Sequence, residues 1–193
     1  MGFLSVLSYA HQLVAARVQP GDTAIDATVG TGADTLFLAK AAGKRGRVYG
    51  FDIQQAALDY ARRRLEEDSS SSLAEVSLLL QGHEQMREAV PDLLHGKVAA
   101  VMFNLGYLPS EGADLTVITH TDSTLVALEA ALHLLRPRGI LTAVLYPGHA
   151  GGREEAEAVL QWASALPVSS GQSIIYRQLQ LDASPYVVAV EKK

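Results

Sequence analysis

Segments with the apolar spacing of helices alternate with short apolar runs typical of buried strands, and this alternation restricts the fold more than any other feature. Repeated strand–helix units build a mainly parallel sheet with helices on both faces. We therefore predict an α/β fold with a mostly parallel seven-stranded sheet. The expected strands are residues 23–27, 46–51, 76–80, 98–103, 140–145, 173–180 and 186–191, of which the last two form an antiparallel pair.

The helices that should cover this sheet follow from the same pattern. Residues 104–119 and 146–152 are expected to be loops, and a loop as long as the first is usually functional in a compact domain. The length of 193 residues predicts that residues 1–193 form a single domain. The expected helices are 3–18, 33–42, 54–67, 83–94, 121–135 and 153–165.

The composition excludes several kinds of site. The sequence has no cysteine, which rules out disulfides, zinc–thiolate sites, iron–sulfur clusters and cysteine nucleophiles. The spacing of the six histidines suggests no metal site. No apolar run is long enough to span a membrane, and the apolar N-terminus lacks the basic start of a signal peptide. We expect a cytoplasmic protein with no metal and no membrane partner.

The net charge of −5 limits how the chain can bind nucleic acid. Non-specific nucleic-acid binders are usually basic, so an RNA substrate would have to dock on a local basic patch. Basic clusters lie at 44–47, 62–64 and 136–138, although charged runs are usually solvated faces. We favour Arg153, because it begins a helix at the expected cleft rim, where a phosphate could dock. A homodimer would join two weak patches.

The strongest local signal for a ligand site is the turn between the first strand and the following helix. Residues 26–35 read DATVGTGADT, with Gly30 and Gly32 between an apolar strand and a helix start. Glycines permit a tight turn and close approach of a ligand, and a helix N-terminus offers free N–H groups. A plain strand–helix turn is the alternative interpretation.

An acidic residue ends the second strand. Asp52 follows the glycine turn by about 20 residues, the spacing at which a carboxylate binds ribose hydroxyls. Asp52 alone could equally be a helix N-cap. The neighbouring turn favours the ligand role.

The turn also distinguishes between two adenosine cofactors. A dinucleotide fingerprint would place a glycine where this chain has Thr35. Carboxylates would repel a pyrophosphate, whereas Asp26 or Asp34 could meet the cationic amino-acid end of S-adenosylmethionine. We therefore predict S-adenosylmethionine as the cofactor and S-adenosylhomocysteine as its product.

A third signal directly follows the fourth strand. Residues 103–109 read FNLGYLP and resemble the Asn-Pro-Pro-Tyr motif of amine-directed methyltransferases, with Leu105 and Gly106 in place of the prolines. The resemblance implies that the Asn104 side-chain oxygen accepts a hydrogen bond from the target nitrogen and that Tyr107 stacks on the substrate base. Alternatively, Asn104 is a turn residue and Tyr107 a partly buried wall.

Four segments together carry a family resemblance. Residues 26–39, 50–54, 103–109 and 146–159 read DATVGTGADTLFLA, GFDIQ, FNLGYLP and YPGHAGGREEAEAV. The chain resembles the bacterial "putative rRNA methylase" family, whose characterised members resemble methyltransferases of the tRNA wobble uridine. The resemblance implies a Rossmann-like class I methyltransferase fold. It also implies methyl transfer from S-adenosylmethionine to the exocyclic amine of 5-aminomethyl-2-thiouridine, with the tRNA anticodon stem-loop as substrate.

The expected site combines these signals with the family resemblance. Asn104, Tyr107 and His149 are the expected catalytic residues. The substrate is expected to contact Tyr107, His120, His149 and Arg153. The residues expected to bind the cofactor are Asp26, Thr28, Gly30, Gly32, Asp34, Thr35, Asp52, Gln54, His83 and Asn104.

The histidines fall into two groups. His149 lies in a polar loop after the fifth strand, and His120 flanks the same cleft. Either of them, or Asp34, could take the proton of the acceptor amine. Helix capping is the alternative for His83. The histidines expected to be surface or packing residues are His11, His95 and His133.

Other functions stay open at this point. A methyltransferase of the same fold could act on rRNA or on a small-molecule amine. A non-catalytic cofactor-binding module would have no need of the polar loops that follow strands four and five. A dehydrogenase is the least favoured, because the dinucleotide fingerprint is missing.

Overall fold

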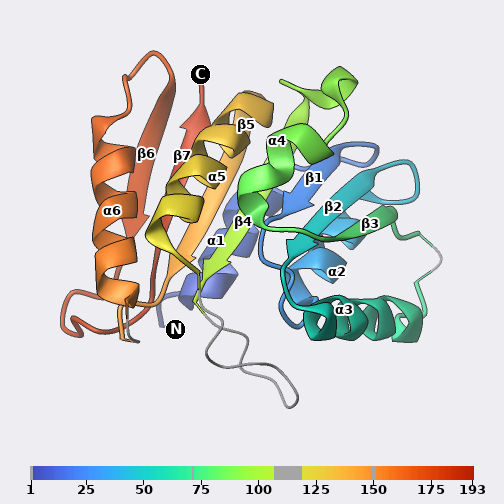
Figure 1. Cartoon of the computed structure of the whole chain (residues 1–193), viewed down its shortest axis with the longest axis horizontal. Helices are drawn as coiled ribbons and strands as arrows, with labels where there is room; N and C mark the ends of the chain where they lie inside the picture. Colours follow the sequence, from blue (N-terminus) through green and yellow to red (C-terminus); the bar gives the residue numbers. More distant parts are fainter. Residues whose placement is uncertain (1, 71, 107–118, 149–150) are drawn as a thin grey trace.

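Seven strands form one sheet in the computed structural model, which describes residues 2–70, 72–106, 119–148 and 151–193 (Figure 1). The first five strands run parallel, and β7 is antiparallel to both β5 and β6. The predicted mostly parallel sheet with a terminal antiparallel pair is therefore observed. The strands are β1 Thr23–Asp26, β2 Arg47–Asp52, β3 Glu75–Leu80, β4 Val98–Leu105, β5 Leu135–Leu145, β6 Gly171–Tyr176 and β7 Tyr186–Lys192, in the order β3-β2-β1-β4-β5-β7-β6.

Helices cover both faces of the sheet (Figure 1). One face carries α1 (Val6–Ala15), α2 (Ala33–Ala42) and α3 (Gln55–Glu67). The other face carries the short α4 (Met86–Ala89), α5 (Thr121–Leu134) and α6 (Gly152–Ala165). None of the helices in the described part of the chain is long and apolar enough to cross a membrane.

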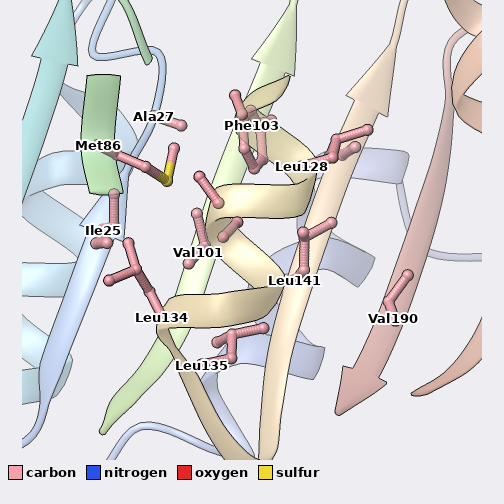
Figure 2. Packing of buried hydrophobic residues seen from close by; sticks show 14 of the residues in the cluster. Ile25, Ala27, Met86, Val101, Phe103, Leu128, Leu134, Leu135, Leu141 and Val190 are labelled. Atoms are coloured by element: carbon pink, nitrogen blue, oxygen red, sulfur yellow. The ribbon is translucent and has the colours of Figure 1, made fainter. Parts of the chain in front are cut away.

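The period-two alternation of β4 divides the core into two layers. Phe103 and Val101 point to the layer formed with α5 and α6, which Figure 2 shows from close by. Met102 and Ala100 point to the opposite layer, formed with α1 and α2. Because successive side chains of a strand face opposite sides, a strand that is buried on both faces is mostly apolar, as residues 98–103 of β4 are. Full burial of a side chain such as Phe103 contributes about 1.5–3 kcal/mol.

Two predicted elements are wrong in detail. The helix expected at 83–94 is broken into a 3₁₀ turn at His83–Gln85, α4, and a second 3₁₀ turn at Asp92–Leu94. Pro91 lacks the N–H that a continuous helix needs, and it disfavours the helical conformation of the residue before it. Val90 accordingly has extended backbone, with ψ of 127°.

Residues 136–139, which lie between the expected helix 121–135 and the expected strand 140–145, are part of β5 instead. This strand already begins at Leu135, and its pairing with β4 shifts register between Val98 and Ala100. Arg138, close to this shift, adopts the left-handed conformation with φ of 64°, as one residue of a β-bulge can. Smaller differences of boundary occur at α1, which is shorter than the expected 3–18, and at β6, which ends at Tyr176 and not at residue 180.

The strand order indicates at which edge of the sheet a ligand binds. β1 pairs with β2 on one side and with β4 on the other, so the order reverses beside β1. Ligands of open α/β sheets bind outside the carboxyl ends of the strands at such a reversal. Asp26, Asp52 and Asn104 all stand at or next to strand carboxyl ends there.

Candidate functional site

A cavity of about 600 Å³ opens at the carboxyl ends of β1, β2 and β4. Its size is in the range of small-molecule and cofactor pockets. Apolar walls from Val29, Phe51 and Ile53 stand beside carboxylates and amides, which suits a ligand with a flat apolar part and polar ends. The polar side chains lining it come from Thr28, Thr31, Asp34, Asp52, Gln54, Gln81, His83, Glu84, Asn104, Thr119, His120, Ser123 and Tyr146.

Asp52 and the glycine turn hold one end of the cavity. The Gly30 N–H donates to Asp52 Oδ2 at 3.0 Å, and the Gln54 N–H donates to Oδ1 at 2.9 Å. Burial raises the pKa of the Asp52 carboxyl, and the backbone donors partly offset that rise. The carboxylate is thus fixed by two amides, while its remaining lone pairs face the cavity.

Asp26 lies beneath the turn and not in the cavity wall. Its side chain is fully buried and accepts hydrogen bonds from the Thr35 hydroxyl at 2.5 Å and the Thr28 N–H at 3.2 Å. Burial, and then the neighbouring Asp34, raise the pKa of Asp26 to about 7. Asp26 therefore braces the two ends of the turn, and of these two carboxylates only Asp34 lines the cavity.

The raised pKa of Asp26 predicts a specific pH dependence of stability. Between about pH 4 and 7 the folded protein binds a proton that the unfolded chain has lost, so stability falls as pH rises through this window. The slope is at most about 1.4 kcal/mol per pH unit. Asp26→Asn is expected to flatten this part of the curve. Urea unfolding of the wild type and of Asp26→Asn at pH 5 and 7 measures the effect. An equal fall in the free energy of unfolding for both proteins between these pH values would contradict the prediction.

The orientation of Asn104 is set by its neighbours. Its Nδ2 donates to Asp34 Oδ2, and because a carboxylate oxygen accepts, this contact assigns the nitrogen to that side. Its Oδ1 faces the Tyr146 hydroxyl, which donates over a long 3.4 Å. The Asn104 backbone N–H donates to the Thr28 hydroxyl at 2.6 Å, which ties the end of β4 to the glycine turn. Asn104 thereby presents an acceptor oxygen in the cavity.

His11 is a residue that sequence reasoning assigned to the surface or to packing. Its Nε2 lies 2.6 Å from Asp34 Oδ1, and its ring stacks on Phe37 at 4.1 Å. Twenty-three residues separate His11 from Asp34, so no local motif could indicate the contact. Tyr146 was also missed, although its place directly after β5 could have indicated it, since strand carboxyl ends meet at one edge.

His83 is buried beside Phe103, with the rings 5.8 Å apart in an edge-on arrangement. Burial lowers its pKa, which favours the neutral imidazole. It begins the 3₁₀ turn after β3 and lines the cavity at the end where Asp52 lies. A neutral ring there can both donate and accept a hydrogen bond.

A buried carboxylate joins the starts of α5 and α6. Glu155 is only 2% exposed and accepts from the Thr119 hydroxyl and the Thr124 hydroxyl, both at 2.6 Å. It lies in the first turn of α6, where the helix dipole favours a negative charge. Thr119 lines the cavity, so Glu155 fixes one part of its wall from behind.

Glu155→Ala is expected to destabilise the protein by about 2–4 kcal/mol, because two hydroxyls lose their partner and a cavity is left. The neighbouring Glu154 is exposed and provides the matched control. Denaturant unfolding of Glu155→Ala and Glu154→Ala measures the difference. Equal stabilities would show that the bridge contributes nothing.

The structure brings most of the predicted cofactor residues together. Thr28, Gly30, Asp34, Asp52, Gln54, His83 and Asn104 all line the cavity, as does the predicted substrate contact His120. Three predicted residues are not among the described residues that line the cavity: Asp26, Gly32 and Thr35. Asp26 and Thr35 are hydrogen-bonded to each other beneath the turn, and Gly32 is the N-cap of α2. Arg153 is exposed near the start of α6. The predicted residues Tyr107 and His149 lie outside the described residues.

The family model described as "Putative rRNA methylase" matches residues 48–191. The chain belongs to this family. A chloroplastic tRNA (mnm(5)s(2)U34)-methyltransferase of Arabidopsis thaliana is 40% identical to the methylase over 95% of this chain and 68% of its own length. The predicted family and the prediction of a methyltransferase are thus confirmed.

Solved structures agree with this family membership. A "putative rRNA-methylase" from Clostridium thermocellum is 35% identical, with a TM-score of 0.90 over the whole of both chains. A "putative methyltransferase" from Streptococcus mutans, in complex with SAH, is 31% identical, with a TM-score of 0.84 over the whole of both chains. The predicted class I methyltransferase fold is confirmed.

Proposed function

We propose that this methylase transfers a methyl group from S-adenosylmethionine to the exocyclic amine of 5-aminomethyl-2-thiouridine at the tRNA wobble position. The observation that carries the proposal is the 40% identity, over 95% of the chain, to a methyltransferase named for mnm(5)s(2)U34. The acceptor oxygen of Asn104 in the cavity supports it, because an amine nitrogen carries the N–H that such an oxygen binds.

The cavity suits this cofactor. The Asp52 carboxylate, held by two backbone amides, is the acceptor for the ribose hydroxyls. The Asp34 carboxylate, at the opposite side of the glycine turn, attracts the cationic amino-acid end. Val29, Phe51 and Ile53 provide apolar wall for the adenine. When bound, S-adenosylmethionine supplies an activated methyl group.

The protein contributes position and proton removal. An alkylamine has a pKa near that of lysine, about 10, so it reaches the site protonated and must lose a proton before it can attack. Asn104 Oδ1 accepts an N–H of the amine and thereby directs its lone pair. Alignment of this kind can supply roughly 7–11 kcal/mol of rate acceleration.

Docking of an anticodon stem-loop needs local positive charge on an acidic protein. Two residues of the predicted basic clusters already form ion pairs within the protein. Arg136 donates two hydrogen bonds to Asp22, and Arg62 pairs with Asp59. Arg153 is exposed near the start of α6 and is the residue proposed to meet a phosphate. A single domain, a cytoplasmic location and a homodimer stay predictions.

Transfer of labelled methyl to RNA from a strain lacking the protein tests the proposal. Nucleoside mass spectrometry is expected to find the label in 5-methylaminomethyl-2-thiouridine from tRNA. Label in rRNA would instead support the activity that the family description names. Label in free metabolites alone would indicate a small-molecule methyltransferase, and binding of S-adenosylmethionine without any transfer would indicate a non-catalytic module.

A further inference from the structure

Four side chains form a continuous hydrogen-bonded chain along the wall of the cavity. His11 meets Asp34 at 2.6 Å, Asp34 accepts from Asn104, and Asn104 accepts from Tyr146 at 3.4 Å. The members come from α1, from α2, from β4 and from the residue after β5. Asp34, Asn104 and Tyr146 line the cavity, and His11 extends the chain away from it.

His11 is the end of this chain that reaches solvent. Its side chain is 32% exposed, whereas that of Asp34 is 9% exposed. Stacking on Phe37, with the planes 8° apart, fixes the ring so that one edge faces the carboxylate. The ring therefore connects a nearly buried acceptor to bulk water.

Among the described residues, the following groups carry or can carry charge near His11 and Asp34. Asp34, from α2, is the charged partner that the ring meets, and Asp34 itself interacts with Asp26 on β1 and with Tyr146 after β5. Arg17, just after the end of α1, forms an ion pair with Glu191 of β7. Tyr9, on α1 itself, stacks on Tyr176.

We propose that His11, acting through Asp34, is the route by which the proton of the acceptor amine leaves the site. This inference rests on the proposed function. Because His11 acts through another residue, it is a positioning residue for Asp34 as well as the final carrier of the proton. Imidazole suits this task because it exchanges protons between about pH 5 and 8.

The proton balance of the reaction requires that one proton leave the site in each turnover. At rest, His11 Nε2 and Asp34 Oδ1 share one proton. The ammonium group of the substrate gives a proton to Asp34, the shared proton moves fully onto Nε2, and the ring releases its Nδ1 proton to water. Water then restores the starting tautomer. The freed lone pair forms the new N–C bond as the methyl–sulfur bond breaks, and sulfur keeps that electron pair. The product is a secondary ammonium, so each turnover releases one proton.

His11→Gln is the decisive variant, because glutamine can still donate a hydrogen bond to Asp34 but cannot carry a proton. We expect kcat at pH 7 to fall about 100-fold, with KM for tRNA and affinity for S-adenosylhomocysteine unchanged. The deficit should shrink as pH rises, and added imidazole should restore part of the rate. His133→Gln, on the exposed side of α5, is the matched control and should keep the wild-type rate.

Two results would overturn the inference. One is a His11→Gln protein with wild-type kcat, or with a loss that is equal at every pH and insensitive to imidazole. The other comes from NMR of the free protein, where the shared His11–Asp34 proton should give a downfield signal that is lost in His11→Gln and in Asp34→Asn. Absence of that signal from the wild type would show that His11 and Asp34 do not share a proton in solution. If the wild type methylates no tRNA, the proposed function fails, and the NMR signal still decides whether the pair exists.

Discussion

Asn104→Ala is expected to lower the rate of methyl transfer by about 100-fold or more, with S-adenosylhomocysteine still bound. The variant removes Asn104 Oδ1, the oxygen proposed to orient the acceptor nitrogen. It also removes the Asn104 Nδ2 that donates to Asp34 Oδ2, so this carboxylate oxygen loses a hydrogen-bond partner. Misplacement of a reacting group by about 1 Å already costs on the order of 100-fold. Single-turnover transfer of labelled methyl to tRNA, with calorimetry for S-adenosylhomocysteine, measures the two effects separately.

A matched amide-to-alanine change controls for general damage. Gln172 is an exposed amide on the edge strand β6, and Gln172→Ala is expected to keep the wild-type rate. Asn104 is the sole asparagine of the sequence, so ¹⁵N-asparagine labelling gives a single side-chain amide group, seen as one pair of N–H signals that share a nitrogen frequency. These signals should shift in Asp34→Ala if the carboxylate holds the amide. An Asn104→Ala protein with full turnover would remove Asn104 from the mechanism.

Gly32→Ala is expected to destabilise the protein by about 2–5 kcal/mol and to abolish cofactor binding. Gly32 adopts φ of +75°, which costs a residue with a side chain about 1–2 kcal/mol. An added Cβ would also lie 2.5 Å from Ala61 Cα and 2.8 Å from Ala61 Cβ, so backbone would have to move, at a cost of about 1–3 kcal/mol. Ala61 lies in α3 and Gly32 in the turn that cradles the ligand, so relief of the contact moves the turn and the helix apart.

Gly96→Ala separates the cost of the left-handed backbone conformation from the cost of the contact with Ala61. Gly96 has nearly the same φ, +71°, and an added Cβ there would meet nothing within 4 Å. Gly96→Ala should therefore show the conformational cost alone, with normal cofactor binding. Urea unfolding and titration with S-adenosylhomocysteine compare the two variants. Equal losses of stability in both would show that the contact with Ala61 is harmless.

The sequence alone predicted the fold class and the residues that line one end of the cavity. Apolar runs that alternate with segments of helical spacing are local signals, and they predicted the sheet and the presence of helices on both of its faces. The glycine turn and Asp52 are also local, since each directly follows a strand, and strand ends converge at one edge of a parallel sheet. Asn104 was predicted from its motif, which follows the fourth strand, and the structure places it near the carboxyl end of β4 at the same edge.

Tertiary structure decided the contacts between residues far apart in the chain. The His11–Asp34 pair joins positions 23 residues apart, and the Asn104–Asp34 contact spans 70 residues. Asp26 was expected in the cofactor pocket, yet the fold buries it beneath the turn and leaves the cavity to Asp34. Which carboxylate faces the ligand depends on how α1 and α2 pack over the sheet. That packing is a property of the assembled core, and no periodicity in the sequence encodes it.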